Sequence, residues 1–183
     1  HHVHTPDLRG HGPAPQRRGD IDHLLQLEED LEDLILSLEL PADARVIVAG
    51  HSAGGGLALR FSAAVCQRQR AEIPLHGVIL LAPYLHHLAP NMRRDSRWAQ
   101  PRIARMLACA LLNRLGIHRL DSIEVLGFNI PPEYRDAHTT DAYSWRLMTG
   151  LNPRDYQSDL KALAHHQLPV LALIGEHDEA FHA

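Results

Sequence analysis

Residues 45–60 read Arg45-Val46-Ile47-Val48-Ala49-Gly50-His51-Ser52-Ala53-Gly54-Gly55-Gly56-Leu57-Ala58-Leu59-Arg60. A short β-branched, apolar run comes first, and a second apolar run with helical character follows the glycines. Between the two runs lies Ser52, flanked by Gly50 and Gly54 in the pattern G-x-S-x-G. The pattern predicts a serine exposed on a tight turn that joins a strand to a helix.

The flanking glycines predict that this turn is crowded. A side chain at Gly50 or Gly54 is expected to collide with the backbone, and Ser52 is expected to adopt a strained conformation. A helix that begins near Ala53 would direct its N-terminal N–H groups and positive dipole end toward the serine. Ser52 is therefore the candidate nucleophile, and the Ala53 N–H is the candidate oxyanion donor.

Two other interpretations fit a glycine-rich turn, namely a plain connection and a cradle for a phosphate. A dinucleotide-binding loop has the pattern G-x-G-x-x-G, and a P-loop has Gly-Lys-Ser/Thr. Neither pattern occurs in residues 45–60. The spacing and the strand-to-helix context favour the nucleophile.

Composition limits the class of protein. The chain has 183 residues, of which 45% are hydrophobic, so it can bury the core of one domain. A net charge of -4, with 18 basic and 22 acidic residues, gives no reason to expect a nucleic acid partner. Cys66 and Cys109 are expected to be reduced core residues. No apolar run is long enough to span a membrane and no signal-peptide pattern is present, whereas compartment, oligomeric state and membrane contact stay open.

Two further apolar runs, 78–81 and 168–174, predict strands buried on both faces. Because helical patterns separate these runs, the chain is expected to form an α/β fold, with a mostly parallel sheet flanked by helices. Functional residues in such sheets lie at the carboxyl ends of the strands. Ser52 and Asp178 both follow such ends.

Three other segments complete the expected organisation. Residues 2–5 are a plausible strand end, and leucines from Leu24 to Leu38 recur in steps of three and four, which predicts a helix. The acidic run 28–33 is expected to be the solvated side of that helix. Residues 85–152 read as an insertion with one helix pattern, from Ile103 to Gly116.

A turn-rich loop lies about 40 residues before Ser52 and reads Asp7-Leu8-Arg9-Gly10-His11-Gly12. Together with the elbow, it resembles the α/β-hydrolases, in particular the serine aminopeptidase and lysophospholipase-like branch that includes monoacylglycerol lipases. The resemblance covers residues 2–83 and 153–181. It implies an incomplete hydrolase core at 1–84 and 153–183, and a helical cap insertion at 85–152.

The same resemblance implies that Asp178, after a late strand, is the acid of a Ser-His-Asp triad, with Glu176 and Glu179 as fallback candidates. In the family the histidine follows one more strand, and no residue of this chain matches it. His182 lies on the same short loop as the acid, and His51 would point away from the serine. The chain therefore looks truncated at both ends, and the fragment alone is expected to be marginally stable and inactive.

The implied activity is that of a serine hydrolase that cleaves lipophilic carboxylic esters of the monoacylglycerol or lysophospholipid type through an acyl-enzyme on Ser52. A peptidase on the same fold and a non-catalytic binding or scaffold protein are the alternatives. A small-molecule ester is the expected partner, and no cofactor is expected. The histidine pairs 86–87 and 165–166, and His1 with its neighbours, lack metal-ligand spacing, so no metal is expected either.

Overall fold

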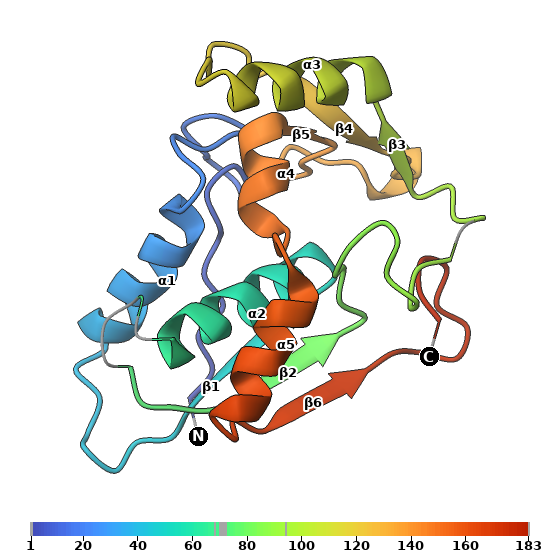
Figure 1. The fold of residues 1–183 in the computed structure, drawn as a ribbon. Coiled ribbons are helices and arrows are strands. Elements are labelled where there is room, and N and C mark those ends of the chain that lie inside the picture. Colours follow the sequence, from blue (N-terminus) through green and yellow to red (C-terminus); the bar gives the residue numbers. More distant parts are fainter. Residues whose placement is uncertain (1, 68, 70–72, 94, 183) are drawn as a thin grey trace. The chain divides into compact units, whose positions relative to one another are not determined.

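The chain folds into two compact units, described here from a computed structural model (Figure 1). The parallel-sheet unit comprises residues 27–96 and 151–183, and the antiparallel-sheet unit comprises residues 1–26 and 97–150. The structure describes residues 2–67, 69, 73–93 and 95–182. His1 therefore lies outside the described residues.

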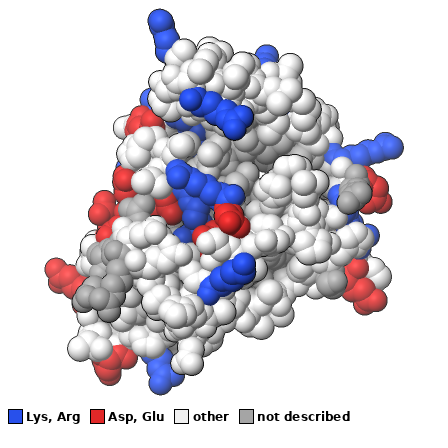
Figure 2. Space-filling view, in the orientation of Figure 1, with Lys and Arg blue, Asp and Glu red and all other residues white. Residues whose placement is uncertain are grey.

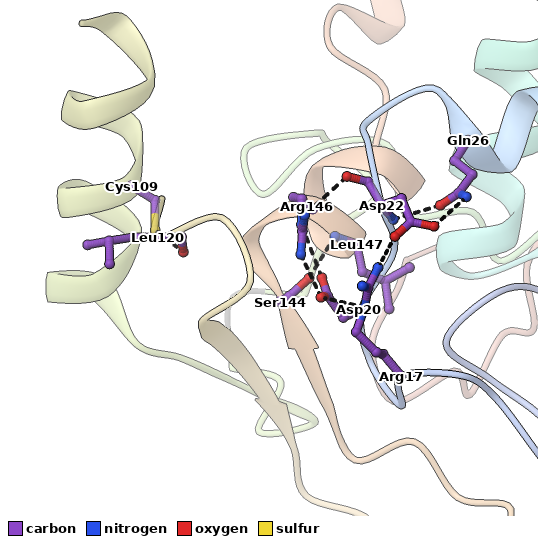
Figure 3. A network of polar contacts seen from close by, with 9 residues as sticks. All are labelled: Arg17, Asp20, Asp22, Gln26, Cys109, Leu120, Ser144, Arg146 and Leu147. Atoms are coloured by element: carbon purple, nitrogen blue, oxygen red, sulfur yellow. Dashed lines mark hydrogen bonds and ion pairs between the residues drawn. The ribbon is translucent and has the colours of Figure 1, made fainter. Parts of the chain in front are cut away.

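Residues 1–26 group with the antiparallel-sheet unit and not with the sheet that carries Ser52. Ion pairs hold the loop there. The carboxylate of Asp20 contacts Arg146 (Nη2–Oδ2 2.7 Å) and Arg17 (Nε–Oδ2 3.2 Å), as Figure 3 shows. Only 9% of Asp20 is exposed, so its charge needs these partners. The loop pattern in the sequence gave no sign of partners 126 residues away. The division into a hydrolase core and a cap stays a prediction.

The parallel-sheet unit contains three parallel strands in the order β1-β2-β6. Val48 lies opposite Val78, and Leu80 lies opposite Ala172. The expected α/β fold class, with a mostly parallel sheet and flanking helices, is confirmed. The bounds of the elements are Val46–His51 (β1), Leu75–Leu81 (β2), Val170–Leu173 (β6), Gln26–Ser37 (α1), Ala53–Cys66 (α2) and Tyr156–His165 (α5).

One face of this sheet is covered and the other is not. Helices α2 and α5 pack on the covered face and bury a core with the strands, formed by Ala58, Leu59, Ala63, Val78, Leu80, Ala162 and Leu163. Side chains alternate between faces, so Ile47, Leu81 and Leu173 share the other face. These three are 55%, 38% and 50% exposed. The prediction of strands buried on both faces is therefore wrong for the described chain.

Helix α1 confirms the helix predicted from the leucine spacing, but its acidic run is not entirely solvated. Glu28 is 2% exposed and forms a two-point ion pair with Arg60 of α2 (Nε–Oε1 3.0 Å, Nη2–Oε2 2.7 Å). Arg60 also donates to the carbonyl of Asn152 (3.1 Å). A buried carboxylate requires such pairing, which a periodicity count does not reveal.

The antiparallel-sheet unit holds a small sheet in the order β3-β4-β5. Helix α3 confirms the helix predicted before Gly116, and it packs on this unit's core of Cys109, Val125 and Met148. The sheet itself was not expected, because strands of three residues are too short to show alternation. The bounds are Ala99–Pro101 (β3), Ile103–Arg114 (α3), Glu124–Phe128 (β4), Pro132–Tyr134 (a 3₁₀ turn, η1), Ala142–Ser144 (β5) and Trp145–Leu151 (α4).

The N-terminal segment differs from the expected one. Residues 2–8 form no regular element, so the strand end expected at residues 2–5 is wrong. Within the described residues, none of the helices combines the length and apolar character that crossing a bilayer demands.

Candidate active site

Ser52 lies on the turn between the end of β1 and the start of α2, in an unusual backbone conformation. Its φ is 51° and its ψ is -120°, a region that costs a non-glycine residue of the order of 1–3 kcal/mol. Four backbone hydrogen bonds hold it there. The Ser52 N–H donates to the Leu81 carbonyl (3.0 Å), and the Ser52 carbonyl accepts from Gly55 and Tyr84 (2.9 Å each) and from Gly56 (3.3 Å). The surrounding backbone therefore imposes the strain on the serine.

The glycines of the elbow differ in what they do. A Cβ at Gly50 would lie 2.0 Å from the carbonyl oxygen of Gly54, so no side chain fits at Gly50. A Cβ at Gly54 would meet nothing within 4 Å, and the expected steric reason for that glycine is therefore wrong. Gly55 and Gly56 are crowded as well, because a Cβ at Gly55 would lie 2.8 Å from the Pro83 side chain and a Cβ at Gly56 would lie 2.6 Å from the Tyr84 carbonyl oxygen. The run of three glycines was the signal for this close approach.

The serine side chain is partly exposed and forms no cap on α2. Because α2 begins at Ala53, the Ala53 and Gly54 N–H groups belong to the first turn and have no intrahelical acceptor. These N–H groups and the positive end of the helix dipole create a site that favours negative charge. The start of α2 can thus stabilise an oxyanion next to the Ser52 hydroxyl.

Asp178 lies in the loop that follows β6, half-buried and tightly held. Its Oδ1 accepts the N–H groups of Ala180 (2.8 Å) and Phe181 (2.9 Å). Phe181 is 4% exposed, and its carbonyl accepts from Arg93 Nε (2.9 Å), which fixes the loop to residues 91–93. Within the described chain, Oδ2 of Asp178 has no partner, so that oxygen is available to orient another group.

Both residues lie at the same edge of one sheet. β2 separates β1 from β6, and the register continues past the strand ends, where the Ala82 N–H donates to the Leu173 carbonyl (2.7 Å). Two strand spacings set the strand ends about 10 Å apart. The arrangement leaves room for a group that bridges Ser52 and Asp178.

Within the parallel-sheet unit, none of the described histidines lies within hydrogen-bonding distance of the Ser52 hydroxyl or the Asp178 carboxylate. His51 belongs to the uncovered face of the sheet with Leu81, which points it away from the serine. His182 is exposed on the Asp178 loop, and its N–H donates to the Asn91 carbonyl (2.7 Å). Burial and the neighbouring His87 lower the pKa of His86, which follows β2.

In the described part of the chain, no three His, Cys, Asp or Glu side chains gather where they could hold a metal ion. The loop of residues 7–26 lines a cavity of about 300 Å³ in the antiparallel-sheet unit. Its charged groups pair with one another, as Arg17 does with Asp20 and Asp22. The cavity belongs to a different unit from Ser52 and contributes no group to the site described above.

The known proteins that this chain resembles have the same fold. A monoacylglycerol lipase from Paleococcus ferrophilus superposes with a TM-score of 0.60 at 20% identity, over 95% of this chain and 62% of that one. A monoglyceride lipase from Saccharomyces cerevisiae, solved with a substrate analogue, gives 0.57 at 15% identity, over 97% of this chain and 59% of that one. The chain thus spans about three-fifths of the length of these two structures. A comparison with curated protein sequences found no match.

The family model for the alpha/beta hydrolase family matches residues 1–183, the whole of the sequence. The chain belongs to the alpha/beta hydrolase family.

Proposed function

We propose that the chain carries the nucleophile and the acid of a serine hydrolase that cleaves carboxylic esters. The observation that carries the proposal is Ser52, held at φ 51° on a turn where no side chain fits at Gly50. A protein without catalytic use for this serine has no reason to keep such strain. Asp178 supports the proposal, because it lies at the same sheet edge with one carboxylate oxygen available.

In the proposed mechanism the Ser52 Oγ attacks the ester carbonyl while a histidine takes its proton. None of the described histidines of the parallel-sheet unit is in reach, and we propose that this base comes from elsewhere in the full-length protein. The oxyanion of the tetrahedral intermediate accepts the Ala53 N–H. The histidine then protonates the leaving alcohol, and water, deprotonated by the same histidine, releases the acid from Ser52. Asp178 Oδ2 accepts the other ring N–H and so fixes the tautomer of the base.

The proposed substrates are lipophilic acyl esters of the monoacylglycerol or lysophospholipid type. Support comes from the family and from the printed names of the two lipases with a similar fold. Because their identity to this chain is only 20% and 15%, the head group and the acyl length are part of the proposal.

A fluorophosphonate probe tests the nucleophile on the full-length protein. We expect the probe to label Ser52, to fail on the Ser52→Ala variant, and to label the Ser158→Ala control, whose serine is exposed on α5. Undiminished labelling of Ser52→Ala, or no labelling of a folded wild-type protein, would refute the proposal. The second outcome would favour a non-catalytic scaffold.

We also propose that residues 1–183 alone do not hydrolyse esters. Without a histidine near Ser52, the hydroxyl has no base to accept its proton. We therefore expect no hydrolysis of a short aryl ester by the fragment beyond the solvent rate. Turnover by the fragment that disappears in Ser52→Ala would show that a base is present in these residues.

A further inference from the structure

Helix α3 exposes a row of large apolar side chains. One side of the helix packs inward through Met106 and Cys109. The other side presents an apolar residue at every fourth position, which places all four in one row along the helix. We name this row the α3 ridge. It consists of Ile103, Leu107, Leu111 and Leu115, which are 57%, 66%, 61% and 67% exposed.

The ridge continues past the end of the helix. Gly116 has a φ of 72°, which turns the chain after the last helical turn. Two more apolar side chains follow, Ile117 at 40% and Leu120 at 37% exposure. An exposed apolar surface of this kind marks an interaction site more often than a freely solvated surface.

The charged side chains of the segment that carries the ridge have one sign. Residues 97–120 contain no Asp or Glu, although the whole chain has a net charge of -4. In Figure 2 the surface around α3, at the top of the view, is white with blue side chains. This segment therefore combines apolar and cationic surface, and a partner for it should be apolar and anionic. The basic residues of the segment are Arg97, Arg102, Arg105, Arg114 and Arg119.

The fold does not use the side chains of all these arginines. Arg102 pairs with Glu124 (Nη1–Oε2 2.7 Å), and Arg105 donates to the Glu124 carbonyl (3.0 Å). The side chains of Arg114 and Arg119 have no partner among the described residues. Arg114 precedes Leu115 on the last turn of α3, so its guanidinium can reach phosphates beside the ridge while its methylene chain lies along apolar surface.

We propose that the α3 ridge docks on an anionic lipid bilayer, with α3 in the plane of the interface. Leu107 and Leu111 enter the boundary between head groups and acyl chains, and Arg114 and Arg119 contact lipid phosphates. At 12 residues, α3 is too short to span a bilayer but long enough to lie in its surface. This inference does not depend on the activity proposed above.

The arginines decide between lipid and the other possible occupants. A second copy of this chain would bring a ridge of the same charge, so Arg114 and Arg119 would repel their counterparts. A carboxylate-rich protein could match the charge, but a ridge offers no pocket in which an anchor side chain could bury. A bilayer matches both the convex apolar row and the positive sign.

Vesicle flotation with the full-length protein tests the docking. The probes are vesicles of phosphatidylcholine alone, and vesicles in which about one-third of it is replaced by phosphatidylserine. We expect Leu107→Gln with Leu111→Gln to lower partitioning into both vesicles about 100-fold. Arg114→Gln with Arg119→Gln should lower it about 30-fold on the anionic vesicles and little on the neutral ones.

The matched control is Leu36→Gln with Leu88→Gln, since these leucines are 53% and 72% exposed in the parallel-sheet unit. We expect this control to bind like wild type. The inference is overturned if wild type binds neither vesicle, or if Leu107→Gln with Leu111→Gln binds as well as the control. A wild-type dimer in sedimentation that only the ridge variant dissociates, without vesicle binding, would assign the ridge to a second copy instead.

Discussion

Helices α2 and α3 are both rich in apolar residues, and they use them in opposite ways. In α2 every residue from Gly55 to Ala63 is buried, whereas in α3 only Cys109 is. The same contrast holds for charge, because Arg60 of α2 is buried against Glu28 and Arg114 of α3 is exposed without a partner among the described residues. In α2 the size of each residue is limited by the packed core around the helix. In α3 the large apolar residues face outward, where the fold sets no such limit.

The largest expected effect concerns the serine at the start of α2. In the full-length protein, the proposed function predicts that Ser52→Ala and Asp178→Asn each lower kcat at least about 10⁴-fold, because each would remove a member of one proposed catalytic unit. The double variant should be hardly worse than Ser52→Ala. Steady-state kinetics on an aryl ester measures this, with Ser158→Ala as the control. Independent, additive losses would mean that the two residues do not act together.

The second prediction uses the two arginines. Arg60→Gln leaves Glu28 buried without its ion pair, so we expect the free energy of unfolding to fall by about 3–5 kcal/mol. Arg114→Gln on α3 should change it by less than about 0.5 kcal/mol. Urea unfolding of both variants gives the comparison. Equal losses would mean that the contrast between the two helices is not energetic.

The third prediction tests the crowding of the elbow. Gly50→Ala must move the Gly54 carbonyl, and we expect a cost of about 3 kcal/mol or more. Gly54→Ala meets open space within a helix, so it should be neutral or stabilising by up to about 1 kcal/mol. Thermal unfolding of the two variants distinguishes them. A destabilised Gly54→Ala would restore the symmetrical elbow that the sequence suggests.

The sequence was informative where structure is local. The elbow at Ser52, the helix α1 and the helix α3 follow from patterns within one element, and the structure has all three. Tertiary partners were not visible, so the burial of Glu28 was missed. The strands of the small sheet are too short to leave a pattern, and the face of the large sheet that stays open cannot be distinguished by apolar runs alone.

The smallest expected effect is a pH dependence beside α2. Asp159 of α5 faces Arg60 of α2, Glu28 of α1 and Asp155 at the start of its own helix. Its Oδ2 is buried without a hydrogen bond among the described residues, and burial, against the attraction of Arg60, raises the pKa of Asp159 to about 6.

Because the folded protein holds this proton more tightly than the unfolded chain, the stabilisation is complete below the unfolded pKa of 3.8 and is lost as pH rises through about 6. Asp159→Asn cannot lose the proton, so its free energy of unfolding relative to wild type should increase between pH 4 and 6 and then level off. Urea unfolding across this range measures the difference, with the exposed Asp43→Asn on the segment before β1 as control. A wild-type-like pH profile in Asp159→Asn would mean that the carboxylate is solvated, and that the packing of α5 on α2 is looser than that of α2 on the sheet.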